Sequence, residues 1–241
     1  MDNKIVNYQN CDDVSARWKA MVRRFPALTR ILQFIFDPAH VNPSARKALI
    51  NSLPEDAVIL NIGAGVKKYP RRCVNVDINA FGNVDVVADA QRLPFQDNTI
   101  DLCLMEYVVE HVPYSDKMKA EIYRVLKKGG CLYATVPFMQ SYHGNPDDYY
   151  RFTVSGLPVF FSQFEKLECQ PFGGPASALC NAVKEFLAIA LSFNNKVIYA
   201  VLSQVFIIPV FPFKYLDCLL AKSANAHHLA FSFYYIGRKK G

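Results

Sequence analysis

Charged side chains are scarce in this chain of 241 residues: Asp, Glu, Lys and Arg make up 20 %, against 51 % for Ala, Val, Ile, Leu, Met, Phe, Trp, Tyr and Cys. So apolar a chain can bury a large core, which excludes a disordered, fibrous or disulfide-stapled protein. Internal repeats and low-complexity tracts are also absent. The length fits one domain with additions, or at most a domain and a half.

Cysteine is present but lacks the spacing of a disulfide or metal framework. The chain has 7 cysteines, an odd number, and no two of them form a CxxC pair. Cys103 and Cys131 fall inside apolar runs typical of strands, so we interpret the cysteines as small buried residues in a reducing compartment and expect no metal site. The polar start MDNKIVNYQNCDD predicts no secretory signal and hence a cytoplasmic protein.

The excess of basic side chains lies toward the two ends. Residues 1–56 have 8 basic and 6 acidic side chains, residues 57–170 have 12 and 13, and residues 171–241 have 7 and 2. A neutral centre with basic, apolar ends favours a membrane surface over nucleic acid as the partner. Residues 14–36 contain five basic residues and no acid. They are either an amphipathic element on a membrane or partner, or a helical lid on the main domain.

Apolar strands alternate with helical patterns from residue 44 onward. Near-continuous apolar strands separated by helices predict an α/β fold, a doubly wound and mostly parallel sheet of seven strands covered on both faces. Asn42-Pro43 predicts a helix over 44–53, and a second, amphipathic helix over 115–126 is closed by Lys127-Lys128-Gly129-Gly130. The strands are expected at 57–62, 73–78, 84–88, 100–105, 131–136, 164–170 and 229–237.

This pattern divides the chain into four parts. We expect an N-terminal helical and basic segment at 1–54, the main core at 55–170, an apolar helical insertion at 171–226 and the final core strand at 227–241.

Glycines and acids gather where the predicted strands end, which is where open parallel sheets bind their ligands. Gly63-Ala64-Gly65 follows the first strand, and Asp77, Asp89 and Glu106 follow later ones. Glycines admit a ligand close to the backbone, and a strand-end carboxylate accepts hydrogen bonds from ribose hydroxyls. The pattern therefore predicts a nucleoside site. NAD is disfavoured, because Lys68 replaces the third glycine of GxGxxG and only 14 residues separate Gly63 from Asp77.

Four segments, VILNIGAG, VNVDI, VVADAQRLPFQDNTIDLCLMEYVVEHV and EIYRVLKKGGCLYATVPF, resemble successive motifs of class I S-adenosylmethionine-dependent methyltransferases of the type 11 group. The resemblance covers about residues 55–170 and implies a Rossmann-like methyltransferase fold with S-adenosylmethionine (SAM) as cofactor. Asn61 stands where the family usually has an acid, and Lys67 where it often has a third glycine, so we interpret the turn as a short-loop variant.

The resemblance also implies roles for single residues. Gly63 and Gly65 would approach the methionine part of SAM and Asp77 would hold the ribose. Asp89 with Ala90 would border the adenine, and Glu106 with Tyr107 would form a wall near the sulfonium. The expected cofactor-binding set is completed by Asn61, Ala64 and Ile78.

The segment SYHGNPDDYYRFT (141–153) follows the fifth predicted strand. It resembles the H-x-x-P-x-D-Y-x-R-F-T motif of bacterial methyltransferases found alongside polysaccharide and cell-surface glycan biosynthesis. We take His143 as the candidate general base, Asp148 as the residue that orients it or as the base itself, and Arg151 as a clamp for an anionic group. The alternative is that Asp148 and Arg151 pair to brace the loop while Thr153 caps the next helix. His111 is more easily explained as a structural or wall residue than as a base.

The longest uncharged run, Val197 to Phe213, has 17 residues and contains Pro209 and Pro212. It is at the short limit for spanning a bilayer. Because it lies between two strands of one sheet, a single crossing would put the last strand on the wrong side of the membrane. We therefore expect a helical hairpin in one leaflet, with peripheral membrane contact through 179–221. The alternative is a soluble helical cap or a homodimer face.

Together these features predict a SAM-dependent methyltransferase that O-methylates a sugar or lipid-linked glycan by in-line transfer, at the inner face of the cytoplasmic membrane. The alternative is a non-catalytic, membrane-peripheral binding module that retains the fold. An oxidoreductase is the least favoured explanation.

Overall fold

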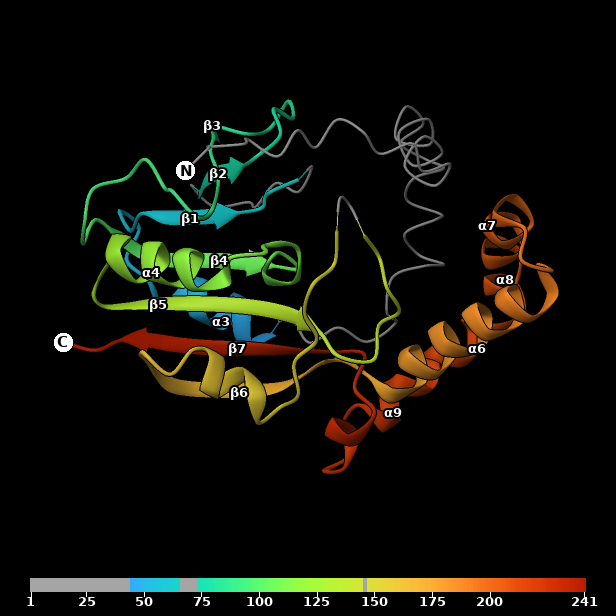
Figure 1. Ribbon diagram of the computed structural model, residues 1–241. Coiled ribbons are helices and arrows are strands. Elements are labelled where there is room, and N and C mark those ends of the chain that lie inside the picture. The colour runs from blue at the N-terminus through green and yellow to red at the C-terminus, as the bar shows by residue number, and fades with distance from the viewer. Residues whose placement is uncertain (1–43, 66–72, 145–146) are drawn as a thin grey trace.

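The computed structural model describes residues 44–65, 73–144 and 147–241. The described residues form a seven-stranded sheet in the order β3-β2-β1-β4-β5-β7-β6. All neighbours pair in parallel except β7, which is antiparallel to both β5 and β6 (Figure 1). The predicted fold class is thereby confirmed. The strands are β1 (Ile59–Ile62), β2 (Cys73–Asp77), β3 (Val86–Val87), β4 (Ile100–Glu106), β5 (Leu126–Pro137), β6 (Phe164–Gly173) and β7 (Ser232–Lys239).

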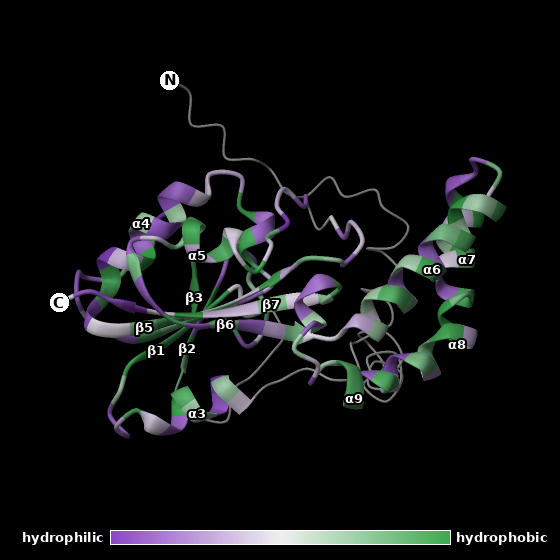
Figure 2. Ribbon diagram, turned by 90° about the horizontal axis from the view of Figure 1, so that it is seen from below, coloured by the Kyte–Doolittle hydropathy of each residue, from purple (hydrophilic) through white to green (hydrophobic). Residues whose placement is uncertain are grey.

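Helices cover both faces of the sheet, because alternate residues of each strand point to opposite sides. On one face, Leu60 and Met105 pack with residues of α4 (Ser115–Val125) and α5 (Gly156–Phe160). On the other, Ile59 and Leu104 pack with residues of α3 (Ser44–Ser52). Figure 2 shows α4 and α5 on one side of the sheet and α3 on the other. The predicted alternation of strands and helices therefore produces a buried, two-sided sheet.

Two element boundaries differ from the prediction. α4 ends at Val125 and β5 begins at Leu126, so Lys127-Lys128-Gly129-Gly130 lies within a strand instead of closing the helix. Pairing with β4 keeps the chain extended, because Leu126 pairs with Ile100 and Cys131 with Leu102, with a register shift between them. The Lys127 ammonium also donates to both carboxylate oxygens of Asp101 at 2.9 and 2.8 Å. β7 begins at Ser232, later than the predicted residue 229. The predictions for 14–36, Asn42-Pro43 and the Lys67-Lys68 turn lie outside the described residues.

Between β6 and β7 the chain forms a helical hairpin, which we call the helical arm (residues 175–220). α6 (Pro175–Leu191) leaves the sheet, and α7 (Lys196–Val205), α8 (Ile207–Val210), η2 (Phe211–Leu216) and α9 (Asp217–Leu220) return along it (Figure 1). At the base of the arm, the Asp217 carboxylate accepts hydrogen bonds from the amides of Ala176 and Ser177 at 2.7 and 2.9 Å. η3 (Ala226–His228) then leads into β7. The arm extends from the edge of the sheet at which β5 ends.

Candidate active site

The glycine turn after β1 has the backbone geometry that only glycine adopts readily. Gly63 has φ +68° and Gly65 has φ +53°, in the left-handed region where a side chain is strained. A Cβ added to Gly63 would lie 2.3 Å from a γ-carbon of Val108, so this glycine allows the chain after β4 to approach β1. Among the described residues, no atom lies within 4 Å of a Cβ added to Gly65. In this part of the structure the second glycine is therefore open at the carboxyl edge of the sheet.

Asp77, the last residue of β2, joins this turn to the neighbouring strand. One carboxylate oxygen accepts a hydrogen bond from the Gly65 amide at 2.8 Å, and the other accepts one from the Asn79 amide at 2.8 Å. Ile78, next to it, leaves 43 % of its surface exposed. This arrangement fits a nucleoside. The mostly buried carboxylate beside the open glycine suits its polar sugar, and the exposed apolar side chain suits its flat base.

Two other predicted cofactor residues have local partners. Asn61 is buried, and its amide nitrogen donates to the side-chain oxygen of Asn75 on β2 at 2.9 Å. Asp89 follows β3 and accepts a hydrogen bond from the Gln91 amide at 2.9 Å, which fixes its own turn. Ala64 is buried and donates its amide to the Val76 carbonyl at 3.1 Å, while Ala90 packs at the margin of the core under α4. These residues shape the edge of the sheet around the glycine turn.

The end of β4 forms the next part of the edge. Glu106 is paired with Arg46 of α3. Tyr107 has φ +56°, and its hydroxyl is 2.8 Å from the hydroxyl of Ser232 at the start of β7. These contacts hold the predicted wall between the ends of β1 and β5. The sequence pattern could not show the Arg46 partner, which comes from a helix 60 positions earlier in the chain.

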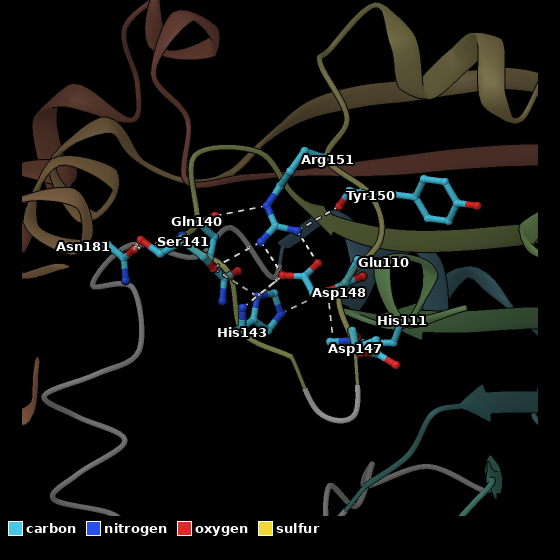
Figure 3. A network of polar contacts seen from close by, with 10 residues as sticks. All are labelled: Glu110, His111, Gln140, Ser141, His143, Asp147, Asp148, Tyr150, Arg151 and Asn181. Atoms are coloured by element: carbon cyan, nitrogen blue, oxygen red, sulfur yellow. Dashed lines mark hydrogen bonds and ion pairs between the residues drawn. The ribbon is translucent and has the colours of Figure 1, made fainter. Parts of the chain in front are cut away.

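The segment after β5 folds back over η1 (Val109–His111), and we call its residues 140–153 the acceptor loop. The Tyr149 amide donates to the Glu110 carbonyl at 2.6 Å, and the Tyr150 hydroxyl donates to the Pro113 carbonyl at 2.8 Å. Ser141 donates its amide to the side chain of Asn181 on α6 at 3.0 Å. The acceptor loop is thus held between the end of β4 and the helical arm (Figure 3).

Asp148 and Arg151 occupy the centre of this loop. The Arg151 guanidinium pairs with both carboxylate oxygens of Asp148, and it also donates to the carbonyls of Gln140, Ser141 and Tyr150 (Figure 3). Thr153 accepts a hydrogen bond from the Gly156 amide at 3.0 Å, next to the start of α5. This arrangement favours the bracing alternative for Arg151 over a clamp, since its donors are directed at the loop itself.

Asp148 also contacts His143. Its carboxylate accepts the His143 amide at 3.0 Å and lies 3.2 Å from Nδ1 of the same histidine. Burial alone would raise the pKa of the Asp148 carboxyl, but the hydrogen bonds from Arg151 and the His143 amide outweigh burial and hold that pKa below its usual range. A carboxylate held in its charged form orients a histidine better than it removes a proton. The geometry therefore favours His143 as the reacting side and Asp148 as the residue that orients it.

Glu110 is a buried residue of this site that the sequence prediction missed. Its side chain has no exposed surface, and neither carboxylate oxygen accepts a hydrogen bond from the described residues. One oxygen faces Nε2 of His143 at 3.5 Å and Nε2 of His111 at 3.9 Å. The only signal in the sequence was the adjacent pair Glu110-His111 directly after a strand. His111 was expected as a wall residue, and it lies across from the ring of His143, with centroids 5.1 Å apart.

The core of the sheet is similar to a known protein family. Residues 51–134 match the family described as a methyltransferase domain. The match ends before the acceptor loop and the helical arm, so it covers the cofactor side of the site.

Curated relatives match over short stretches. The ubiquinone/menaquinone biosynthesis C-methyltransferase UbiE of Rickettsia prowazekii is 35 % identical over 79 residues, 32 % of this chain and 32 % of the relative. The demethylmenaquinone methyltransferase of Protochlamydia amoebophila is 38 % identical over 65 residues, 25 % of this chain and 27 % of the relative. The chain thus spans about a third of the length of the curated relatives that it matches.

Solved structures share the fold at low identity. Phosphoethanolamine N-methyltransferase 2 of Haemonchus contortus, in complex with SAM, has a TM-score of 0.53 and 15 % identity, over 87 % of this chain and 56 % of that one. The [4+2]-cyclase SpnF has a TM-score of 0.51 and 15 % identity, over 91 % and 95 %. Since one neighbour is a methyltransferase and the other a cyclase, the shared fold alone leaves the reaction open.

Proposed function

We propose that the protein is a SAM-dependent methyltransferase. The observation that supports this most directly is the open glycine turn of a methyltransferase domain, bound to the strand-end carboxylate of Asp77. The residues fit the cofactor, because Gly65 leaves room for a ligand where any other residue would place a side chain. Gly63 and Gly65 would admit the methionine part, and Asp77 with Ile78 would hold the nucleoside.

In this reaction no covalent bond to the chain itself has to form. When bound, SAM supplies an electrophilic methyl group on a sulfonium. The chain has to hold an acceptor in line at about 3 Å and accept or stabilise its proton. The acceptor loop does the first, because it is fixed to η1, to α6 and to its own Asp148–Arg151 pair. We assign the second to the group that His143 forms with Glu110, whose carboxylate faces Nε2 of the histidine.

The proposed acceptor is the hydroxyl group of a lipid-linked sugar. Two tyrosines of the acceptor loop support a sugar, since Tyr142 is 71 % exposed and Tyr149 is 47 % exposed and each offers a flat ring beside the site. The resemblance of the loop to methyltransferases found with glycan biosynthesis points to the same class. The names of the curated relatives suggest a second lipid class, a quinone ring, which the acceptor experiment below includes as a separate arm.

The helical arm supports the lipid part of this proposal. By length and composition alone, Lys196–Leu220 is the one segment of the described chain that could cross a membrane. Its most apolar 18-residue window has a mean hydropathy of 1.8 and is 11 % buried. Its course back to α6 favours a hairpin lying in one leaflet, because Asp217 at its end caps the first turn of α6. The most exposed apolar side chains of the arm, each at least 60 % exposed, are those of Phe186, Ile189, Phe193, Val197, Phe213 and Leu219. We propose that this surface docks on the inner face of the cytoplasmic membrane.

Cofactor binding tests the first part of the proposal. Asp77→Ala removes the carboxylate that would hold the ribose, so we expect it to weaken SAM binding by about tenfold or more in calorimetry. The matched control is Asp85→Ala, which removes a carboxylate that braces β2 by accepting the Asn75 amide. We expect the control to bind SAM like the wild type. Absence of SAM binding by the wild type would overturn the proposal.

Methyl transfer to an extracted acceptor tests the second part. We would incubate the protein with SAM carrying a radiolabelled methyl group and three acceptor pools: membrane lipids rich in lipid-linked sugars, lipid quinones, and soluble sugars. Label in the first pool, lost in His143→Ala, is the expected result. Label in the quinone pool or the soluble pool would contradict the proposed acceptor. SAM binding without transfer to any pool would favour the non-catalytic binding module.

A further inference from the structure

Three groups that prefer to bind cations face one another where β4 and β5 end. They are the carboxylate of Glu110 and the imidazoles of His111 and His143, each of which offers one ligand atom within 4.8 Å of the other two. Nε2 of each histidine faces the Glu110 carboxylate. Glu110 and His111 come from η1, directly after the residue that packs on Gly63, and His143 comes from the acceptor loop. The contact of Val108 with Gly63 puts this cluster next to the glycine turn. Figure 3 shows the three side chains gathered beside Asp148.

The hydrogen bonds made by Nδ1 of each histidine determine whether its Nε2 has a free lone pair. Nδ1 of His111 lies 2.5 Å from the Asp147 carbonyl, which only accepts hydrogen bonds, so this nitrogen bears the proton. Nδ1 of His143 faces the Ser141 carbonyl at 3.3 Å and the Asp148 carboxylate at 3.2 Å, so it bears its proton too. In the neutral form of each ring, Nε2 then has a free lone pair. Both lone pairs are on the side of Glu110.

Two imidazole lone pairs and one carboxylate cannot satisfy one another. Glu110 is fully buried and accepts no hydrogen bond from the described residues, and an isolated buried charge is costly. The guanidinium of Arg151, in the acceptor loop, is paired with Asp148. A proton on one histidine would leave the lone pair of the other histidine without a partner. A dication would bind both lone pairs and the carboxylate at once. Holding the outer nitrogen of each histidine on a carboxylate or a carbonyl is also the usual arrangement behind metal ligands.

We propose that Glu110, His111 and His143 bind a divalent transition-metal ion, of the kind that Zn²⁺ represents. Two histidines and one glutamate are a known ligand set for zinc, with metal–nitrogen distances of about 2.0–2.1 Å, which puts neighbouring ligand atoms about 3.3 Å apart. The Glu110 oxygen is already 3.5 Å from one Nε2 and 3.9 Å from the other. Three protein ligands leave at least one position open, and the partial exposure of both histidines, 21 % and 25 %, places it toward solvent.

The role of the ion rests on the proposed methyl transfer, although its binding does not. An acceptor hydroxyl in the open position would have its pKa lowered by the ion. The hydroxyl proton would pass to water, and the oxygen would form the new bond to the methyl carbon as the carbon–sulfur bond breaks toward sulfur. His143 would then act as a ligand and not as a free base. The sequence-based expectation of no metal site considered cysteine alone, and this ligand set contains none.

Metal binding by the full chain tests the proposal. We would strip the protein with a chelator, titrate it with Zn²⁺ by calorimetry, and record the visible spectrum with Co²⁺. One ion per chain is expected, with binding weakened at least about tenfold in Glu110→Gln and in His143→Asn. The matched control replaces both His227 and His228 by Ala, since these neighbouring histidines have ring centroids 4.2 Å apart and lie outside the cluster. We expect the control to bind like the wild type.

Three results would overturn the site: no stoichiometric binding by the wild type, wild-type binding in both cluster variants, or loss of binding only in the His227/His228 variant. SAM affinity and circular dichroism of each variant show that it is folded, and His143→Asn, at a partly exposed position, serves if Glu110→Gln does not fold. Failure of the proposed function gives a different result, because a wild type that binds Zn²⁺ but not SAM would retain the metal site.

Discussion

Asp148 is the residue on which the conformation of the acceptor loop depends most, because its buried carboxylate joins His143 to Arg151. Asp148→Asn keeps the shape of the side chain but removes its charge. We expect it to lower the free energy of unfolding by about 2 kcal/mol at pH 7, measured by urea denaturation. The matched control is Asp147→Asn. It changes a neighbouring carboxylate that accepts a hydrogen bond from the Tyr149 hydroxyl at 3.1 Å. An equal effect of both variants would contradict the special role of Asp148.

The pKa of Asp148 determines how the difference in stability between the wild type and Asp148→Asn depends on pH. The pKa of Asp148 is lowered on folding, so its contribution is complete above its ordinary value of 3.8 and is lost as the pH falls through the lower folded value. The difference between wild type and Asp148→Asn should therefore be constant from pH 7 to pH 5 and shrink below about pH 4. Denaturation curves at several pH values measure it. A difference that grows on acidification would contradict the assignment.

Single residues also show how far the sequence could predict the site. The strand-end positions of Gly63, Gly65 and Asp77 follow from local patterns, because a glycine turn and an acid after an apolar run need no knowledge of distant contacts. Glu110 was missed for the opposite reason. Its burial against His143 depends on the acceptor loop folding back over η1, and the two segments are more than 30 residues apart in the chain.

At the scale of elements, each of the seven strands overlaps the apolar run that predicted it, although some boundaries differ, because burial on both faces requires such runs. The error at Lys127-Lys128-Gly129-Gly130 has a tertiary cause, since the partner of Lys127 is Asp101 on the neighbouring strand. The apolar segment after β6 was ambiguous in sequence. A run of apolar residues predicts a helix but does not determine whether that helix crosses a membrane, lies on it or packs against a partner.

The first turn of α6 depends on a residue from the other end of the helical arm. Asp217 is buried and caps the amides of Ala176 and Ser177, so Asp217→Ala should destabilise the base of the arm by about 1–2 kcal/mol. We expect faster hydrogen exchange at these two amides. The matched control is Asn195→Ala, which removes the cap of α7 at the far end of the arm, where Asn195 accepts the Val197 and Ile198 amides. The control should speed exchange in α7 and leave α6 unchanged, and the same exchange pattern in both variants would contradict the prediction.

At the scale of the whole molecule, we expect the helical arm to bind lipid and the core to contribute little to that binding. Phe186→Glu and Leu219→Glu place charges on side chains that are 70 % and 75 % exposed on the arm. We expect the double variant to lose at least about tenfold in partitioning to vesicles of neutral and anionic phospholipid, because burying a carboxylate in the interface is unfavourable. The matched control is Val159→Glu on α5, at a side chain that is 74 % exposed on the core. It should partition like the wild type.

The same variants distinguish a membrane from a second copy of the chain. If the arm were a homodimer face, the wild type would sediment as a dimer without lipid, and Phe186→Glu with Leu219→Glu would convert it to a monomer. We expect instead that the wild type stays monomeric in detergent and collects on vesicles, while SAM binding by the core is the same in the wild type and both variants. Asp77 on β2 and the glycine turn after β1 are separated by β4 and β5 from β7 and β6, the strands between which the arm is inserted. A charge on the arm should therefore not reach the cofactor site. Loss of SAM affinity in the arm variant would contradict this separation of docking and cofactor binding.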